Sequence, residues 1–398
     1  MDAYVFDWLN LLLRWTHVVV AIAWIGSSFY FVFLDNSLTP PADPALQEKG
    51  VGGELWAVHG GGFYNPQKYL VAPRKIPEHL HWFYWESYAT WLTGFALFTV
   101  LYLWRAGTFL IDRNVHDWTP PAAIAAALGF LAAFWLVYDG ICRVFGQKEG
   151  GERIVGIGVM AFVVFAAWLA CRLFAGRAAF LLVGAMLATA MSANVFFWII
   201  PGQRTAVAQL KAGQPVDPVH GRRAKQRSVH NTYFTLPVLV AMLSNHYGFL
   251  YGAKGNWWVL VLLMLAGALI RHSFVARHKA LVQARRVPWE YAALGVLVLA
   301  GLAFWLAPPL QAKGVASAPP SFANVKAVVD RRCVMCHNAQ LASKNVRLDT
   351  AESIASHAQQ LYQQAVVLKT MPLNNATQIT DAERALLGHW FEAGAPTR

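Results

Sequence analysis

The sequence predicts an all-α protein: a bundle of eight transmembrane helices followed by a small helical domain. Of its 398 residues, 57% are hydrophobic and only 14% are charged, whereas soluble domains usually carry about 25% charged residues. Several apolar runs reach the length of about 20 residues that a helix needs to cross a bilayer. The apolar pattern ends near residue 307, and the rest of the chain is polar.

The eight spans follow one another as separate apolar runs. The first run has no basic start and no cleavage site, so we expect an uncleaved span and not a signal peptide. Trp and Tyr stand at many span ends, as in the aromatic belts of membrane interfaces. The spans are expected at residues 8–34, 82–104, 121–143, 154–175, 178–200, 231–248, 257–276 and 289–307.

The chain divides into an integral membrane domain over 1–307, a linker over 308–321 and a polar domain over 322–398. The linker is rich in Pro, Ala and Gly, which is typical of a semi-rigid spacer. Helices are expected in the polar domain at 322–332, 351–369 and 381–393. Thr380 and Glu383 fit a capping box for the last of these, and Gly394 fits its end.

The polar domain carries the sequence Cys-Val-Met-Cys-His at residues 333–337. This is the C-x-x-C-H tag of covalently attached haem c. Cys333 and Cys336 are expected to form thioethers with the haem, and His337 is expected to be the proximal iron ligand. A structural zinc site is the alternative, but it needs a second Cys/His pair, and no further Cys follows.

Met371, in the sequence KTMPLNN, is the expected sixth ligand of the iron. His357 and His389 compete for this role, although each is expected in the middle of a helix. A His337 and Met371 pair would raise the reduction potential and make an electron acceptor. We therefore predict a class I-like cytochrome c domain that passes electrons, so the chemistry on a substrate must occur elsewhere.

Two arguments give the same orientation. Haem c is attached outside a bacterial inner membrane, so the C-terminus is expected in the periplasm and, with eight spans, the N-terminus as well. The loops then assigned to the cytoplasm hold 18 Lys and Arg, against five in the periplasmic loops. This asymmetry is what the positive-inside rule requires. Because the basic residues lie in short loops between the spans, topology explains the net charge of +12. We therefore expect membrane lipid and not nucleic acid as a partner.

The two remaining cysteines are expected as free thiols. With this topology, Cys142 lies at the cytoplasmic end of the third span and Cys171 at the periplasmic end of the fourth. They are separated by almost the full bilayer thickness of about 30 Å, which is too far for a disulfide.

Polar residues inside the spans gather in the cytoplasmic half. Such residues are costly in a membrane and are candidates for function. The alternatives are helix caps, snorkelling side chains and interhelical ion pairs. The set comprises Glu86, Asp139, Arg143, Asn194, Gln203, Arg204, His230, Asn231, Thr232 and Glu290.

Two histidines, His17 and His246, lie nearer the periplasmic half. A lone histidine in a membrane is usually a hydrogen-bonded packing residue. However, electrons that leave a cytoplasmic-side substrate must cross most of the bilayer to reach haem c. We therefore consider a haem b held by His17, with His246 as the second ligand, as a relay.

The first large loop contains the Gly-rich sequence GGELWAVHGGGFYNPQKY at residues 52–69. Its Gly triplet beside aromatic residues suggests a loop that folds close to a ligand or back into the bundle. It lacks the Lys-Ser/Thr ending of a phosphate loop, so nucleotide binding is not supported.

Several long motifs resemble those of the bacterial membrane-bound urate hydroxylases with a C-terminal cytochrome c domain. They are RWTHVVVAIAWIGSSFYFVFLDNSL, GELWAVHGGGFY, HWFYWESYATWLTG, GRRAKQRSVHNTYFTLPVLVAMLSNHY and MPLNNATQITDAERALLGHWFEAGAP. The resemblance covers essentially the whole chain. The first motif is also similar to small membrane haem proteins of the protoporphyrinogen oxidase type, which have a His in the same setting as His17.

The resemblance implies oxidation of urate to 5-hydroxyisourate in purine breakdown. Urate is an anion at neutral pH, so charge complementarity favours Arg143, Arg204 and Arg222 as binding residues, with Asn194 beside them. Water adds to the oxidised ring, and a general base must take a proton. The candidates for this base are Glu86, Asp139 and His230.

Electrons would leave through the haem c to a soluble cytochrome c or a terminal oxidase, so no peroxide need form at the site. A non-catalytic electron-transfer subunit is one alternative. The other is a quinol or porphyrinogen oxidoreductase that uses the same bundle.

Overall fold

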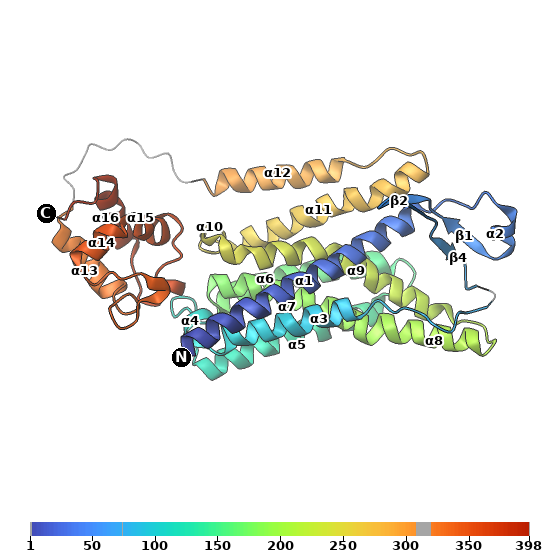
Figure 1. Ribbon diagram of the computed structural model, residues 1–398, viewed down its shortest axis with the longest axis horizontal. Helices are drawn as coiled ribbons and strands as arrows, with labels where there is room; N and C mark the ends of the chain where they lie inside the picture. The colour runs from blue at the N-terminus through green and yellow to red at the C-terminus, as the bar shows by residue number, and fades with distance from the viewer. Residues whose placement is uncertain (1, 74, 308–319, 398) are drawn as a thin grey trace.

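The computed structural model describes residues 2–73, 75–307 and 320–397. The chain is mostly helical, with a few short strands. Long helices run side by side along one axis, and a small helical domain lies at one end of them (Figure 1). The N-terminus lies at the same end of the bundle as this small domain.

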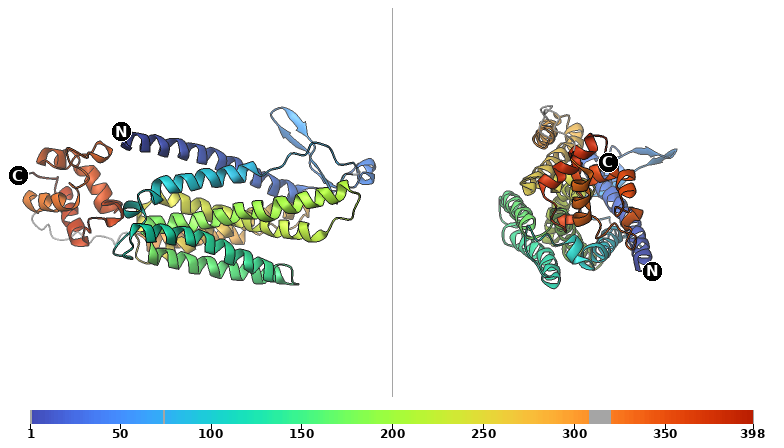
Figure 2. Two further views of the ribbon diagram at one scale, coloured as in Figure 1. Left: turned by 90° about the horizontal axis from the view of Figure 1, so that it is seen from below. Right: turned by 90° about the vertical axis from the view of Figure 1, so that its left-hand side faces the viewer.

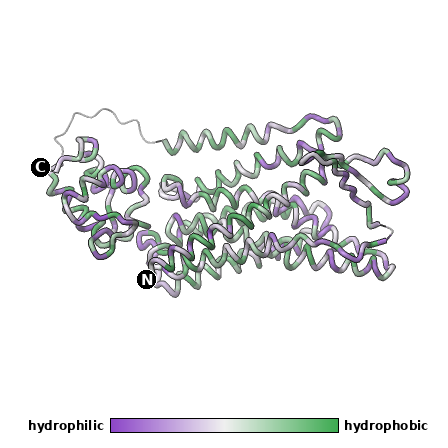
Figure 3. The backbone as a smooth tube through the Cα atoms, viewed as in Figure 1, coloured by the Kyte–Doolittle hydropathy of each residue, from purple (hydrophilic) through white to green (hydrophobic). Residues whose placement is uncertain are grey.

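Five helical segments are long and apolar enough to cross a membrane, and each overlaps a region that the sequence predicts as a span. Hydrophobic residues dominate the middle of the bundle helices (Figure 3). The five segments are Tyr4–Ser37 of α1 (Asp2–Ser37), α5 (Pro120–Phe145), α6 (Gly151–Leu173), Gly176–Lys211 and α11 (Asn256–Val282).

The segment Gly176–Lys211 is one continuous helical run of three parts. These are α7 (Gly176–Asn194), a π-helical turn η2 (Val195–Ile199) and α8 (Ile200–Lys211). The predicted span ends at residue 200, so the prediction of a loop directly after it is wrong. Arg204 stands on α8 and not in a loop.

The other three predicted spans also fall on helices, but these helices are shorter or more polar. They are α3 (Trp85–Phe98) with the π-helical turn η1 (Thr99–Leu103), α9 (Pro218–Leu243) and α12 (Glu290–Trp305). α9 begins at Pro218, well before the predicted start at residue 231. Its first half is therefore a helix that carries polar residues into the bundle.

α7 is the most buried helix of the bundle and packs against α5, α6 and α9. Small residues allow this close approach, as is usual for helices in membranes. A Cβ added at Gly184 would lie 2.8 Å from the Cβ of Ala241 on α9. By contrast, α1 is peripheral and packs mainly against α3 and α11, with many exposed apolar side chains.

The segment between α1 and α3 holds the short helix α2 (Pro44–Glu48) and four short strands. The strands pair as two antiparallel ladders, β1 with β4 and β2 with β3. Their bounds are β1 (Val51–Glu54), β2 (Ala57–His59), β3 (Gly62–Tyr64) and β4 (Gln67–Tyr69).

The β2–β3 hairpin projects away from the helices (Figure 2). Gly60 and Gly61 form its turn with φ of 58° and 80°, a conformation that favours glycine. Trp56 and Phe63 are exposed. The expectation that this loop folds back into the bundle is therefore wrong for the hairpin.

The C-terminal domain has its own apolar core, formed by residues such as Val329, Ile354, Leu387 and Trp390. Residues 308–319, most of the predicted linker, lie outside the described residues. The helices and helical turns are α13 (Phe322–Arg332), η4 (Ser343–Asn345), α14 (Ala351–Ser356), α15 (Ala358–Leu361), η5 (Tyr362–Val367), η6 (Leu373–Asn375) and α16 (Asp381–Glu392).

The predicted helix at 322–332 is confirmed as α13, and the capping box of Thr380 and Glu383 is confirmed at the start of α16. The predicted helix at 351–369 is instead broken at His357, which ends α14 and begins α15.

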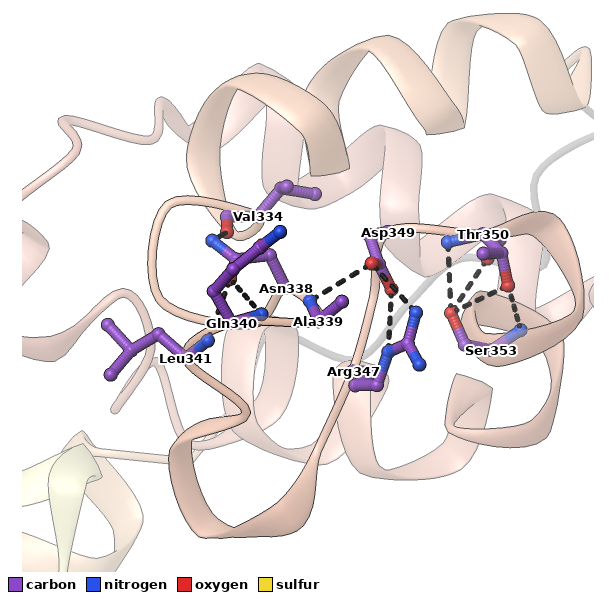
Figure 4. A network of polar contacts seen from close by, with 9 residues as sticks. All are labelled: Val334, Asn338, Ala339, Gln340, Leu341, Arg347, Asp349, Thr350 and Ser353. Carbon is purple, nitrogen blue, oxygen red and sulfur yellow. Dashed lines mark hydrogen bonds and ion pairs between the residues drawn. The ribbon is translucent and has the colours of Figure 1, made fainter.

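Side-chain hydrogen bonds help to order the chain between α13 and α14, around the short turn η4 (Figure 4). The Asn338 side chain accepts from the backbone N–H of Leu341 at 2.8 Å. The Asp349 carboxylate accepts from Arg347, which lowers the Asp349 pKa, and it also accepts from the N–H of Ala339. These bonds hold the loop that follows the C-x-x-C-H tag.

The C-terminal domain contacts the near end of the bundle, where α4 (Ala106–Phe109) and α10 (Gly248–Tyr251) lie. The Asn374 side-chain amide donates to the Thr108 carbonyl at 2.5 Å. A Cβ added at Gly248 would collide with the Leu368 carbonyl oxygen. The contact therefore uses the segment around Met371.

Candidate functional site

A buried network of charged and polar side chains joins α5, α7, η2 and α9. At its centre is Asp139, which is 4% exposed. Its Oδ1 accepts from Arg227 Nη2 at 2.6 Å and from Trp198 Nε1 at 2.7 Å, and its Oδ2 accepts from Arg143 Nε at 2.6 Å. Both carboxylate oxygens are therefore occupied, and Asp139 acts as the counterion of two guanidinium groups.

The network continues through Asn194, which is fully buried. Its Oδ1 accepts from Arg227 Nη1 at 3.3 Å, and its Nδ2 donates to Tyr138 Oη and Asn231 Oδ1, each at 2.9 Å. The Tyr138 hydroxyl lies 2.8 Å from His230 Nδ1.

The tautomer of His230 follows from these contacts. The Tyr138 hydroxyl accepts a hydrogen bond from Asn194. Among the described residues, the acceptor available for the hydroxyl's own proton is His230 Nδ1. The buried O–H therefore donates to Nδ1, because an unpaired buried donor is costly. His230 is then neutral with its proton on Nε2, and it can donate a hydrogen bond to a bound molecule.

Local sequence explains why these residues meet. On α5, Cys142 follows Tyr138 by four residues and Arg143 follows Asp139 by four, so these side chains lie on one side of the helix. On α9, His230 and Asn231 follow Arg227 by three and four residues. The extra residue of the π-helical turn η2, which follows Asn194, turns Trp198 toward Asp139.

A cavity of about 180 Å³ adjoins this network. Trp198 links the two, because its indole nitrogen binds Asp139 while its ring lies 5.5 Å from the guanidinium carbon of Arg223. The lining residues are Phe197, Trp198, Pro201, Gly202, Thr205, His220 and Arg223. Aromatic and cationic side chains together suit a planar anion.

The structure therefore brings together four of the predicted site residues: Asp139, Arg143, Asn194 and His230. Arg204 and Arg222 are exposed at the same end, Arg204 with its guanidinium carbon 5.9 Å from the Tyr84 ring. Both face solvent, and neither contacts the Asp139 network among the described residues.

Glu86 is half-buried in the first turn of α3. Among the described residues, its carboxylate has no hydrogen bond or ion pair. The next residue, Ser87, is buried and hydrogen-bonded to Ser192 of α7, two residues before Asn194. α3 therefore packs beside the part of α7 that carries Asn194, and Glu86 stands one residue before this contact.

Sequence reasoning missed Arg227, Trp198 and Arg223 as site residues. Arg227 was counted among the charges of a cytoplasmic loop, yet it is 3% exposed. Its spacing of three and four residues from His230 and Asn231 is the signal that could have revealed it.

His17 has the hydrogen bonding of a metal ligand. Its Nδ1 lies 3.1 Å from Thr93 Oγ1, which already donates to the Ala89 carbonyl. His17 Nδ1 is therefore the donor, and its Nε2 keeps a free lone pair. Gly94 leaves room for the ring, since a Cβ there would lie 2.8 Å from His17 Cε1.

His246 is exposed in the helical turn η3 (Ser244–His246). The neighbouring Asn245 makes the side-chain contacts of this turn, accepting from Tyr102 Oη at 2.8 Å and Arg177 Nε at 3.1 Å. No hydrogen bond relates His246 to His17 among the described residues, and their pairing stays a prediction.

The residues of the C-x-x-C-H tag fit covalent haem. Cys333 and Cys336 are free thiols, and burial raises the pKa of Cys333 to about 11. His337 Nδ1 lies 3.0 Å from the Val346 carbonyl. A carbonyl only accepts, so Nδ1 carries the proton and Nε2 is left for iron.

Met371 is 36% exposed, and its backbone is held in place by the C-terminal domain. Its N–H donates to the Gln364 carbonyl at 3.0 Å, and its carbonyl accepts from Arg384 Nη1 at 2.8 Å. The competing His357 binds the Ser353 carbonyl through Nδ1, and His389 is exposed on α16. In the described part of the chain, no group of three or more His, Cys, Asp or Glu residues could hold a metal ion.

A comparison with protein families identifies the larger part of the chain. The family model described as Urate oxidase N-terminal matches residues 3–307, which include all the bundle helices and the Asp139 network. No curated protein and no solved structure matches the chain. The match covers well over half of the sequence, and the chain therefore belongs to the Urate oxidase N-terminal family.

Proposed function

We propose that this protein is a membrane-bound urate hydroxylase that oxidises urate to 5-hydroxyisourate. The family match over residues 3–307 carries the proposal. The overall reaction takes urate and water to 5-hydroxyisourate, two protons and two electrons. An acceptor for the electrons is therefore required, and the C-x-x-C-H tag of the same chain is the candidate site for it.

The bundle end that holds α8 and the start of α9 attracts anions. Arg204, Arg222 and Arg223 are exposed there. Inside, Asp139 neutralises only one of its two Arg partners, so the network keeps a positive charge. Exposed charges of one sign raise the local concentration of an oppositely charged substrate. Urate would enter from this end, which is the cytoplasmic one in the proposed topology.

The three proposed acid–base residues differ in what they can do. Asp139 has both carboxylate oxygens engaged, so it holds Arg227 and Arg143 in position. His230 presents Nε2–H and would donate to an oxygen or nitrogen of urate. Glu86 is the carboxylate without a partner among the described residues, and it would accept the proton of the attacking water.

The electrons leave toward the C-terminal domain. A haem attached to Cys333 and Cys336, with His337 and Met371 as iron ligands, would accept electrons one at a time and pass them to a soluble cytochrome c or terminal oxidase. The contact of Asn374 with Thr108 keeps this domain against the bundle. His17, with its free Nε2, is the proposed ligand of a second haem between the two sites.

Addition of urate to anaerobic membranes tests the proposal. We expect the c-type absorbance bands of the reduced haem to appear with urate and not with a quinol. Formation of 5-hydroxyisourate should yield two reduced cytochromes per urate and no peroxide. Reduction by quinol alone would instead support a quinol oxidoreductase, and no reduction by either donor would support an electron-transfer subunit.

The side of the membrane on which Cys333 lies tests the proposed direction of electron transfer. In spheroplasts, a fusion reporter or protease site beside Cys333 should report the periplasm. A reporter at residues 212–217, between α8 and α9, should report the cytoplasm. A common location for both would contradict the proposed path of electrons from the inner to the outer side.

A further inference from the structure

A second buried cation, Arg271 on α11, lies outside the Asp139 network. Its side chain is 7% exposed, and its guanidinium carbon is 3.7 Å from the centroid of the Phe29 ring on α1. Nε and Nη2 are both buried and have no hydrogen-bond partner among the described residues. No carboxylate in the described part of the chain forms an ion pair with it.

Other buried guanidinium groups of the chain are satisfied. Arg227 binds Asp139 and Asn194, and Arg384 binds the carbonyls of Ala365 and Met371. A buried, unpaired charge costs several kcal/mol. Arg271 therefore carries a cost of folding that an anionic ligand would offset.

The unpaired atoms indicate the shape of that ligand. Nε and Nη2 form one edge of the planar guanidinium, which binds two adjacent acceptor atoms of an anion side by side. A carboxylate offers such a pair. The urate monoanion also does, through a carbonyl oxygen and the neighbouring deprotonated ring nitrogen.

An aromatic cluster begins at His272, the residue after Arg271 on α11. Tyr233 Oη lies 2.7 Å from His272 Nδ1, and these two rings are nearly parallel. Tyr291 packs edge-on against His272, with ring centroids 4.5 Å apart. Parallel and edge-on packing are the arrangements that aromatic rings prefer, and a planar ligand would extend them.

This cluster also adjoins the Asp139 network. Tyr233 follows His230 by three residues on α9, so the two side chains are neighbours on one helix face.

We propose that Arg271 anchors the anionic edge of urate, between α1, α9 and α11. The inference rests on the proposed function and adds the residue that recognises the substrate's charge. Five other arginines at this end are poorer candidates: Arg143 and Arg227 already bind Asp139, and Arg204, Arg222 and Arg223 are exposed.

Urate binding to the purified full-length protein tests this inference. Arg271→Gln should weaken binding about a hundredfold, as expected for the loss of two charge-assisted hydrogen bonds. Arg271→Lys keeps the charge without the planar fork and should recover only part of the affinity. Arg285→Gln, which removes an exposed charge just after α11, is the matched control and should bind like the wild type.

Thermal unfolding separates binding from folding. Without urate, Arg271→Gln should melt no lower than the wild type, because it removes an unpaired charge. Urate should raise the melting temperature of the wild type and of Arg285→Gln but not of Arg271→Gln. A lower melting temperature of Arg271→Gln without urate, together with normal urate binding, would assign Arg271 a purely structural role.

Two further results would overturn the inference in different ways. If the wild type oxidises urate and Arg271→Gln does so with an unchanged KM, this inference fails and the proposed function stands. If the absorbance spectrum of Arg271→Gln lacks a non-covalent haem that the wild type contains, the Nε and Nη2 edge of Arg271 binds a haem propionate and not urate. A wild type that does not oxidise urate at all would refute the proposed function itself.

Discussion

Asp139 and Arg227 form a buried ion pair, with 2.6 Å between Oδ1 and Nη2 and both side chains almost inaccessible to solvent. The pair ties α5 to α9 in the polar half of the bundle. Further hydrogen bonds satisfy both side chains: Trp198 and Arg143 donate to Asp139, and Arg227 donates to Asn194. Loss of Asp139 would leave the buried charge of Arg227 without a counterion, and loss of Arg227 would leave Asp139 with only the exposed Arg143.

The first prediction concerns this pair. Arg227→Met should destabilise the protein by about 3–5 kcal/mol, since Asp139 would lose its buried partner. Arg143→Met is the control: its side chain is 59% exposed, so its loss should cost less than about 1 kcal/mol. Unfolding in detergent, followed by circular dichroism, measures both. Equal effects of the two variants would contradict the assigned roles.

Glu86 is predicted to act on the attacking water. Glu86→Gln should lower kcat by about 10²–10⁴-fold, the usual contribution of a positioned base, with little change in KM. Glu290→Gln should leave kcat unchanged, because Glu290 is exposed on α12. Steady-state urate oxidation gives both parameters. A normal kcat in Glu86→Gln would remove Glu86 from the reaction.

Met371 is predicted to set the potential of the haem c. Met371→Ala should lower the midpoint potential, since a Met/His ligand pair raises it. His389→Ala, at the competing residue on α16, should leave the potential and spectrum unchanged. Spectroelectrochemical titration of the full-length protein is the measurement. A spectrum altered by the His389 variant alone would reverse the ligand assignment.

Gly248 is predicted to control the contact between the two domains. Gly248→Val would force the backbone away from Leu368, so the haem should be reduced by urate more slowly at an unchanged midpoint potential. At Gly107 on α4 an added Cβ would meet nothing within 4 Å, and Gly107→Ala is the control. Stopped-flow absorbance after mixing with urate measures the rate. A normal rate in Gly248→Val would show that this contact is dispensable.

Acid should destabilise the C-terminal domain through Glu383. Burial alone would raise the Glu383 pKa, but the Thr380 N–H and the Arg332 guanidinium outweigh it, so the folded-state pKa is lowered. The ionised form therefore adds stability above the unfolded-state pKa. This contribution disappears as the pH falls through the folded-state pKa.

Glu383→Gln should remove that part of the pH dependence, and Glu352→Gln, at an exposed position of α14, should retain it. Protease resistance of residues 320–397 in the full-length protein, measured from neutral to acidic pH, follows the effect. Identical pH profiles for wild type and Glu383→Gln would contradict it.

Apolar periodicity and capping residues were enough to locate helices. α13 and the capping box of α16 match the prediction, because Thr380 and Glu383 act locally. Hydropathy failed at α9, whose first half is polar, because the sequence pattern does not reveal that Arg227 has a buried partner on another helix. The hydrogen bond of Trp198 to Asp139 was also beyond prediction, since it depends on a π-helical turn.

That turn, Val195–Ile199, has an implication for how this helix tolerates changes of length. Each residue of an α-helix advances its direction by about 100°. Deletion of a single residue there could restore a regular helix without breaking it, while rotating all of α8 relative to α7. The protein would keep its helices, but Trp198 would no longer face Asp139. The function of α8 therefore depends on its rotation about the helix axis as well as on its being helical.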